Sequence, residues 1–219
     1  MVAAVEIAFH QLVADPVEGF RRQHQAAEHG LLGLALGVLL NTTRRGGILE
    51  NRVLHTVLNV LVNIIRPIPF IIFAAALGPL TLAVTGSTIG AKSMIFPLTL
   101  AATFGISRIV EQNLVSVDPG VIEAARSMGA SPWKIITSVI LPEALGPLIL
   151  GYTFIFIAVI DMSAMAGYIG GGGVGDFAIV YGYRAFEPQV TWAAVLVIVV
   201  IVQLAQFLGN WLSKKVMRR

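Results

Sequence analysis

Long apolar runs alternate with short polar segments along this chain, and these runs predict membrane-spanning helices. A helix needs about 20 apolar residues to cross the hydrocarbon core of a bilayer. Four runs are long enough, and they cover roughly residues 53–80, 93–116, 143–166 and 190–212. The runs are continuous rather than alternating, which argues against a β-barrel. The expected fold class is therefore an all-α, polytopic membrane helix bundle.

The N-terminal part of the chain does not contain such a run. Residues 31–40 are strongly apolar, but they provide only about half of the length of a span. Titratable side chains crowd the stretch before them: Asp15, Glu18, Arg21, Arg22, His24, Glu28 and His29. Each charge at the centre of a span costs about 2.5–3.5 kcal/mol. We therefore expect an atypical N-terminal segment at 1–30 and a membrane domain at 31–219, and we leave open a first span ending near Leu40.

The composition supports membrane insertion and argues against several other classes of protein. The chain is 56% hydrophobic and only 12% charged, whereas soluble domains carry about 25% charged residues. The net charge of +3 and the lack of a basic stripe interleaved with aromatic residues argue against nucleic-acid binding. The chain has no cysteine, which excludes disulfides and thiolate nucleophiles. Its histidines lack metal-ligand spacing, so we expect no metal site.

Lysine and arginine residues gather in alternate loops, which predicts the orientation of the chain, because cytoplasmic loops are enriched in these residues. Segments 41–52 and 117–142 and the C-terminal tail hold Arg44, Arg45, Arg52, Arg126, Lys134, Lys214, Lys215, Arg218 and Arg219. The intervening loops, 81–92 and 167–189, hold only Lys92 and Arg184. We therefore expect the three basic segments in the cytoplasm.

Two charged residues fall inside predicted spans. Arg66 is followed by Pro67 and Pro69, and prolines in a membrane helix free backbone carbonyls that neighbouring groups or water must satisfy. Arg66 either faces a substrate path or extends to the cytoplasmic interface, and the sequence favours neither interpretation. Asp161 either lines such a path or lies at the outer rim of its span. The nearby Gly167 favours the rim.

A glycine-rich stretch at 170–175 and a group of aromatic residues follow on the outer side. The glycines lack the preceding strand and the lysine of a phosphate-binding loop, so we expect a flexible or tightly packed outer loop. The aromatic residues are Tyr181, Tyr183, Phe186 and Trp192. Aromatic side chains at this depth are typical of the membrane interface. A docking surface for an external partner is the alternative.

A polar, helix-prone segment at 117–142 separates the second and third long runs. Asp118, followed by proline, has the residue type of a helix N-cap. Gly129 is expected to end this helix with a positive φ. Ser131, again followed by proline, starts a second short helix, which Pro142 interrupts before the next span. The segment thus predicts two short helices joined by a glycine turn.

This polar segment must leave the bilayer, and it has features of a surface that binds another protein. Small Ala124 and Ala125 permit a close approach, and Ile122, Met128 and Trp133 offer apolar anchors. An ordinary amphipathic loop at the membrane interface would show a similar pattern. The residue types alone leave both interpretations open.

The spacing within the segment resembles the signature loop of ABC importer permeases. That loop reads Glu-Ala-Ala, three residues, glycine, nine residues, and then Ile-x-Leu-Pro. The matching positions are Glu123, Ala124, Ala125, Gly129, Leu141 and Pro142, with Val139 in place of isoleucine. The resemblance implies a coupling helix that sits in a groove of a cytoplasmic ATPase subunit. Arg126, Met128 and Ala130 lie within the same coupling loop.

Residues 38–217 also resemble one branch of this family, the methionine-uptake permeases. The likeness is carried by 37–40, 42–51, 63–72, 163–175 and 181–183. It implies a core of five helices, a homodimer of permeases in the bacterial inner membrane, and two cytoplasmic ABC ATPase subunits. It also implies an external methionine-binding lipoprotein. The partner subunits would bind the ATP, so the permease needs no cofactor and holds no catalytic residue.

The same resemblance suggests residues of a translocation path and shows two departures. Met165 falls where a pore-constricting methionine is expected, and Arg66 and Ser163 are further candidates for the path. Residues 1–30 do not resemble the family's first helix, and Asp161 stands where glycine is usual. The alternatives are an importer permease for another small amino acid or solute, and an autonomous channel or carrier. An intramembrane enzyme would need more convergent polar groups than the spans offer.

Overall fold

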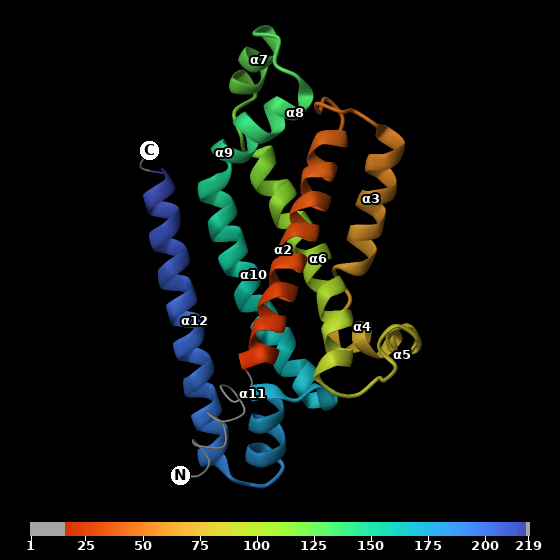
Figure 1. Ribbon diagram of the computed structural model, residues 1–219, viewed down its shortest axis with the longest axis vertical. Helices are drawn as coiled ribbons and strands as arrows, with labels where there is room; N and C mark the ends of the chain where they lie inside the picture. The colour runs from red at the N-terminus through yellow and green to blue at the C-terminus, as the bar shows by residue number, and fades with distance from the viewer. Residues whose placement is uncertain (1–15, 218–219) are drawn as a thin grey trace. The chain divides into compact units, whose positions relative to one another are not determined.

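The structure is a computed structural model that describes the backbone of residues 16–217 and the side chains of residues 30–217 (Figure 1). The α-helices are α2 (Pro16–Thr43), α3 (Arg52–Ile65), α4 (Phe70–Ala76), α5 (Gly78–Thr85), α6 (Ala91–Val115), α7 (Pro119–Ser127), α8 (Pro132–Ile135), α9 (Leu141–Glu143), α10 (Leu145–Ala166), α11 (Gly173–Asp176) and α12 (Pro188–Met217). Three π-helices lie between them: η1 (Ile136–Ile140), η2 (Gly167–Gly171) and η3 (Phe177–Tyr183). No strand occurs among the described residues, so the all-α prediction is confirmed.

The backbone contacts divide the chain into two compact units. Unit 1 comprises Met1–His29, Ile68–Ala102 and Phe156–Ala205. Unit 2 comprises Gly30–Pro67, Thr103–Ile155 and Gln206–Arg219. Helices α6, α10 and α12 each contribute residues to both units.

Three of the four predicted spans are confirmed as long apolar helices. Within the described residues, Ala91–Val115, Leu145–Gly171 and Pro188–Met217 are long and apolar enough to cross a membrane. Of the most apolar 18-residue stretch in each helix, 39%, 11% and 6% is buried, in that order. Helix α6 is therefore the best-buried of the three, most of α10 is at least partly buried, and most of α12 is exposed.

The predicted span at 53–80 is not one continuous helix, because the chain breaks between α3 and α4. The two helices form a bent pair that passes as one membrane span only when both parts are counted together. Pro67 and Pro69 have no N–H, so neither can donate the backbone hydrogen bond that would continue the helix. Pro69 starts α4 instead, where its carbonyl accepts from Ile72 and Phe73 at 3.0 Å.

The part of the chain for which the sequence left a first span open forms one long helix, α2. It covers Pro16–Thr43, of which Gly30–Thr43 is an apolar helix shorter than a full span. The rest of the atypical segment, residues 1–15, lies outside the described residues. Within unit 2 the apolar part of α2 packs closely on α6. A Cβ added at Gly37 would lie 2.6 Å from the Ser107 carbonyl oxygen, and glycines at membrane helix contacts permit this approach.

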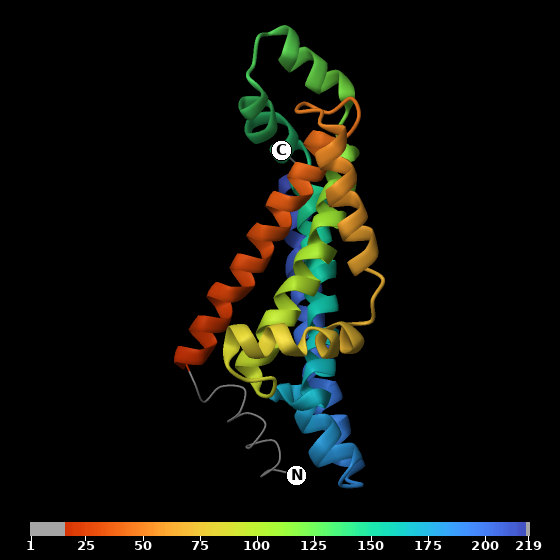
Figure 2. The same ribbon diagram turned by 90° about the vertical axis from the view of Figure 1, so that its right-hand side faces the viewer.

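Unit 1 has its own small apolar core. Buried Phe70, Ala74, Met94 and Ala166 pack together, and Leu98, Ala101, Met162 and Ile169 lie against them. Residues 162 and 166 are four apart, so they mark the packed face of α10, and residue 169 of η2 packs beside them. Figure 2 shows α4 and α5 lying crosswise to α6 within this part of the chain.

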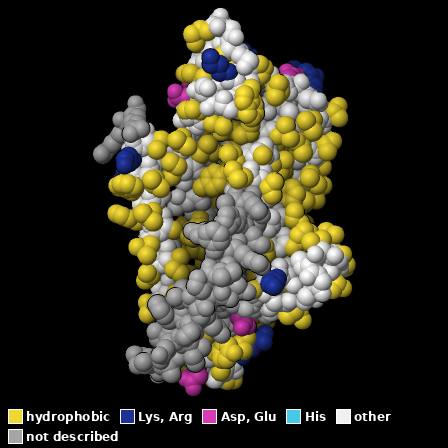
Figure 3. All heavy atoms as spheres, viewed as in Figure 1, with side chains coloured by type: hydrophobic (Ala, Val, Ile, Leu, Met, Phe, Trp, Pro, Cys, Tyr) yellow, Lys and Arg dark blue, Asp and Glu magenta, His cyan; other side chains and the backbone are white. Residues whose placement is uncertain are grey.

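Apolar side chains remain on the surface in large numbers, as expected for a protein that faces lipid. Figure 3 shows them covering α3 and α12 on the face in view. Exposed residues of α12 include Leu196, Val200, Leu204 and Phe207. A water-soluble monomer rarely exposes a continuous apolar surface of this extent. The described surface therefore agrees with the membrane assignment made from the sequence.

Candidate coupling loop and transport path

The first helix of the predicted coupling loop forms as the sequence indicates. The Asp118 carboxylate accepts a hydrogen bond of 2.8 Å from the Gly120 N–H and caps α7. Pro119 occupies the first helical position, where a missing N–H costs nothing because the first N–H groups have no partner in the helix. The two residues fix where α7 begins.

Gly129 ends this helix in the left-handed region, as predicted. Its φ is +77°. The N–H groups of Met128, Gly129 and Ala130 donate to the carbonyls of Ala124, Arg126 and Ala125 at 3.1, 2.9 and 3.1 Å, respectively. An added Cβ at Gly129 would meet nothing within 4 Å. The backbone conformation, and not a lack of space, therefore favours glycine here.

The second helical part differs from the expectation at its end. Ser131 caps α8 as predicted, with its hydroxyl accepting from the Lys134 N–H at 3.4 Å. The chain then continues through the π-helix η1, which was not expected, into α9, and the predicted interruption near Pro142 falls at Ala144, between α9 and α10. Pro142 lies in the first turn of α9, where a proline is tolerated. The Leu141 N–H bonds to the Ile136 carbonyl across the wider π-turn.

Packing within unit 2 brings the two ends of the sequence motif together. Helix α7 contacts both α8 and η1. The buried side chains at these contacts are Ala125, Ile135, Ile136 and Ile140. Leu141 is partly exposed and Pro142 is exposed on α9, directly after η1. The motif thus forms one local structure and not two separate segments.

The opposite side of the loop remains open for a partner. Glu123, Ala124, Arg126 and Gly129 are exposed, and Ala130 is partly exposed. Met128 and Trp133 are 80% and 73% exposed, although both are large apolar side chains. Exposed apolar anchors beside small residues are a typical feature of protein interfaces. Ile122, the third anchor named from the sequence, is only partly exposed.

The loop between α2 and α3 lies against the coupling loop. Arg126 donates from Nη2 to the Gly47 carbonyl at 3.4 Å. Within this loop the Glu50 carboxylate accepts from the Gly46 N–H at 3.0 Å and from Arg52 Nε at 3.2 Å. The backbone hydrogen bond from Gly46 and the bond from Arg52 hold the pKa of Glu50 below its usual value.

The three candidate path residues belong to two different units. Arg66 is exposed at the C-cap of α3 in unit 2, whereas Ser163 and Met165 belong to α10 in unit 1. Ser163 and Met165 are both exposed, with Met165 at 41%. Two residues apart on an α-helix, they point to nearly opposite sides. Only one of them can face a narrow path directly.

Asp161 lies in the last part of α10. It is exposed and precedes the end of the span at Gly171 by about 15 Å, at 1.5 Å per residue. Helical spacing places it on one strip with Met165 and Tyr168, both of which are also exposed. The strip lies beside the packed face of α10. The path and rim interpretations of Asp161 both stay predictions.

The glycine-rich outer loop is tightly packed in unit 1. Gly170 accepts from the Gly90 N–H at 2.9 Å, and Gly170, Gly172 and Gly173 all have positive φ. An added Cβ at Gly175 would collide with the backbone of Ala164. Gly171 and Gly175 therefore serve close backbone contacts, whereas an added Cβ at Gly172 or Gly173 would meet nothing within 4 Å. The sequence left open a flexible loop and a tightly packed loop, and the structure has the tightly packed one.

The aromatic residues after this loop are exposed, as both sequence interpretations require. They are Tyr181, Tyr183, Phe186 and Trp192. Phe186 is the one described residue other than glycine with a positive φ, at 57°. The Arg184 guanidinium lies 5.2 Å from the centre of the Tyr168 ring.

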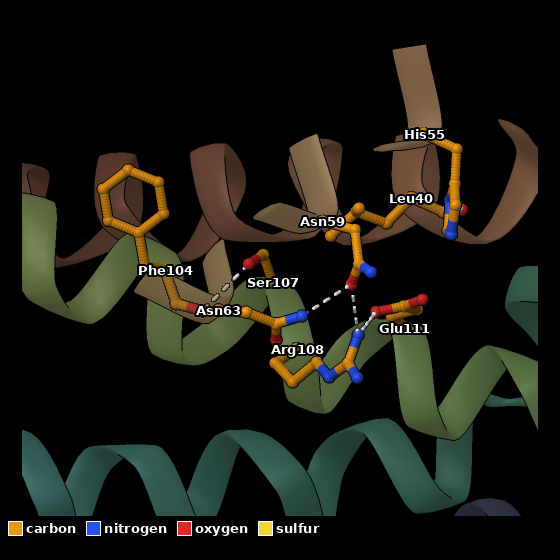
Figure 4. A network of polar contacts seen from close by, with 8 residues as sticks. All are labelled: Leu40, His55, Asn59, Asn63, Phe104, Ser107, Arg108 and Glu111. Carbon is orange, nitrogen blue, oxygen red and sulfur yellow. Dashed lines mark hydrogen bonds and ion pairs between the residues drawn. The ribbon is translucent and has the colours of Figure 1, made fainter. Parts of the chain in front are cut away.

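Sequence reasoning missed a polar network between α3 and α6 (Figure 4). Arg108 donates from Nη1 to the Glu111 carboxylate at 2.7 Å and to the Asn59 side-chain oxygen at 3.1 Å. Asn63 donates to the same Asn59 oxygen at 3.2 Å. Helix α6 continues past both charged residues to Val115. The recurrence of His55, Asn59 and Asn63 every fourth residue was the available signal.

The comparison with protein families now adds to this geometry. The family described as "binding-protein-dependent transport system inner membrane component" matches residues 33–218. The chain belongs to this family. It is therefore a multi-pass permease of the inner membrane, a transport subunit rather than an enzyme. The matched range includes the whole coupling loop and excludes the atypical segment at 1–30.

Relatives within this permease family resemble nearly the whole chain. The probable D-methionine transport system permease protein MetI of Vibrio cholerae is 41% identical over 188 residues, covering 86% of this chain and 84% of the relative. The methionine import system permease protein MetP of Bacillus subtilis is 38% identical over 181 residues, covering 83% and 82%. The family branch proposed from the sequence thus agrees with these relatives.

Solved structures of permeases give the same fold. An inward-facing structure of the MetNI methionine ABC transporter has a TM-score of 0.84 at 38% identity, over 88% of this chain and 91% of that one. An amino acid ABC transporter solved with histidines has a TM-score of 0.64 at 20% identity, a likeness that concerns the fold alone. The ABC importer permease fold is therefore established for this chain.

Proposed function

We propose that this permease carries methionine across the inner membrane as part of an ATP-driven importer. Two copies of the chain would form the translocation unit, two cytoplasmic ABC ATPase subunits would bind and hydrolyse ATP, and an external methionine-binding lipoprotein would deliver the substrate. The observation that carries the proposal is the coupling loop, whose exposed Met128 and Trp133 lie beside a small-residue helix. The methionine permeases among its relatives support the substrate.

The coupling loop would act as a mechanical contact. ATP binding draws ABC ATPase subunits together, and a helix seated on each subunit must follow that movement. Differential contact in the two states then shifts the permease between inward-facing and outward-facing forms. Helix α7 is suited to this task because it has a capped start and a fixed glycine turn, and because it packs on η1. A rigid contact passes on displacement without absorbing it.

Another small amino acid or solute is the second candidate for the substrate. Few polar groups line the described spans, so selectivity could lie largely in the binding protein. An autonomous channel or carrier is the less favoured alternative, since it gives the exposed coupling loop no partner. The two ideas differ in their need for ATP and in their response to competing solutes.

ATP-dependent uptake in vesicles tests the proposed function. The permease is reconstituted with its ATPase and lipoprotein, and labelled methionine is offered with and without ATP inside. We expect uptake only with ATP, and competition by unlabelled methionine but not by leucine or histidine. Uptake of another solute in place of methionine would refute the substrate and retain the importer. Uptake that ignores ATP would refute the importer.

Replacement of Met165 by alanine is expected to raise passive leak. Met165 is exposed on α10, and a bulky apolar side chain at a constriction blocks a pore by excluding water and solute. Vesicles preloaded with methionine should lose it several-fold faster without ATP. Phe156→Ala, nine residues earlier and therefore on the opposite side of α10, is the control. This variant should leave the leak unchanged. Equal leak from both variants and the wild type would argue against Met165 as a constriction.

A further inference from the structure

Helix α3 buries little apolar surface within unit 2. Val62 is its single buried residue, although the helix has an apolar face of Val53, Val57, Val60 and Ile64, all exposed. Its apolar side therefore faces outward, and the hydrophobic effect does not hold it in place. In lipid this effect is absent between helices in any case, and polar contacts take over part of the attachment.

Those polar contacts follow one stripe of the helix. His55, Asn59 and Asn63 are four residues apart and share a face. The His55 Nδ1 lies 3.1 Å from the Leu40 carbonyl oxygen of α2. Asn59 accepts from Arg108 of α6, and Asn63 supports Asn59 from one turn further on. The stripe thus connects α3 to two neighbouring helices, and Asn59 makes the connection to α6.

Arg108 is the centre of this network. A single Nη1 atom serves both Asn59 and Glu111, at 3.1 and 2.7 Å. The two charged side chains are only 26% and 10% exposed. Removing Asn59 or Glu111 is costly when Arg108 is buried to this degree, because the positive charge of Arg108 then loses a hydrogen-bond partner. Figure 4 shows Arg108 lying between Asn59 and Glu111.

The coupling loop provides a second connection between the helices that the polar network joins. Helix α6 ends at Val115, three residues before the Asp118 cap of α7. Arg126 of α7 contacts Gly47, in the loop that leads directly into α3. Asn59 lies about two turns from the start of α3, and Arg108 lies about two turns from the end of α6. Helices α3 and α6 are therefore connected at two places. One is the contact between Arg126 and Gly47 in the loops next to these helices, and the other is the polar network of Asn59, Arg108 and Glu111.

We propose that the Asn59–Arg108–Glu111 clasp makes α3 move with α6 when the coupling loop is displaced. This inference rests on the proposed function of the coupling loop as a contact to an ATPase. Without the clasp, α7 would still be linked to α3 through the Arg126–Gly47 contact at 3.4 Å, but α3 would follow α6 less closely when α7 is displaced. Arg108 and Asn59 are then positioning residues for transport, acting on the helices and not on the substrate.

A matched pair of variants separates this role from simple support. Asn59→Leu removes the acceptor for Arg108, whereas Asn63→Leu removes only the outer support and leaves the Asn59–Arg108 bond. In the reconstituted transporter we expect Asn59→Leu to lower the amount of methionine imported per ATP hydrolysed by about fivefold or more. Asn63→Leu should stay near the wild-type ratio. An unchanged ratio for Asn59→Leu, with equal amounts of folded protein, would overturn the proposal.

A distance measurement tests the proposal without any substrate and remains informative if Asn59→Leu folds poorly. The chain has no cysteine, so spin labels can be placed at Val57→Cys and Gln112→Cys, exposed positions on α3 and α6. In the otherwise wild-type complex we expect one narrow distance distribution, the same without nucleotide and with trapped ATP. A distance that changes by several ångströms between the two states would show that α3 moves separately, whether or not methionine is the substrate.

Discussion

Valine at position 129 is expected to abolish ATP-driven uptake. Gly129 has a φ of +77°, a conformation that costs a residue with a side chain about 1–3 kcal/mol, and most for a β-branched one. The turn after α7 would have to reopen, which would displace Met128 and Trp133 from their shared surface. The expected loss of methionine uptake in reconstituted vesicles is more than tenfold, with little change in the amount of inserted permease.

Two further variants make the Gly129 result specific. Asparagine tolerates the left-handed region better than other residues do, so Gly129→Asn should retain a substantial part of the uptake. Gly105→Ala adds a methyl group within α6, where an added Cβ meets nothing within 4 Å, and should transport normally. If Gly129→Val and Gly129→Asn transported equally well, the turn conformation would not be what the coupling loop needs.

Leucine at position 37 is expected to prevent α2 from docking on α6. A Cβ at Gly37 already meets the Ser107 carbonyl oxygen at 2.6 Å and Val110 Cβ at 2.6 Å, and a leucine extends further. Backbone cannot move away as a flexible side chain can, and overpacking costs about 1–3 kcal/mol or more. The amount of monodisperse permease extracted in detergent should fall several-fold, and its thermal unfolding midpoint should drop.

The control for Gly37 lies on the same helix. Ala35 is exposed, so Ala35→Leu makes a comparable increase in size on a face of α2 that contacts nothing described. This variant should be extracted and should unfold like the wild type. Similar losses in the two variants would mean that insertion of α2, and not its contact with α6, is the sensitive step.

The coupling loop was largely predictable because its determinants are local. The Asp118 cap, the positive φ of Gly129 and the Ser131 cap each depend on backbone groups within three or four residues. Such contacts follow from residue type and spacing. The π-helix η1 before Pro142 was not predictable in this way, because it shifts the hydrogen-bond register by one residue and no residue type predicts a π-turn.

The network on Arg108 could not be read from residue order. Asn59 and Arg108 are 49 residues apart, and they meet because α3 and α6 pack side by side in unit 2. Taken alone, Arg108 and Glu111 look like the end of a span, since two isolated charges are costly in lipid. Paired with each other and with Asn59, they are compensated within the helix.

The apolar runs decided that the chain enters the membrane, how three of its long helices are bounded, and where the coupling loop lies. Those properties depend on transfer free energy and on contacts close in the chain. Tertiary structure decided which side of α3 faces inward, how closely α2 approaches α6, and which charges are compensated. These depend on pairs of groups far apart in the chain, and each partner acquires its meaning only when packing places the other within hydrogen-bond distance.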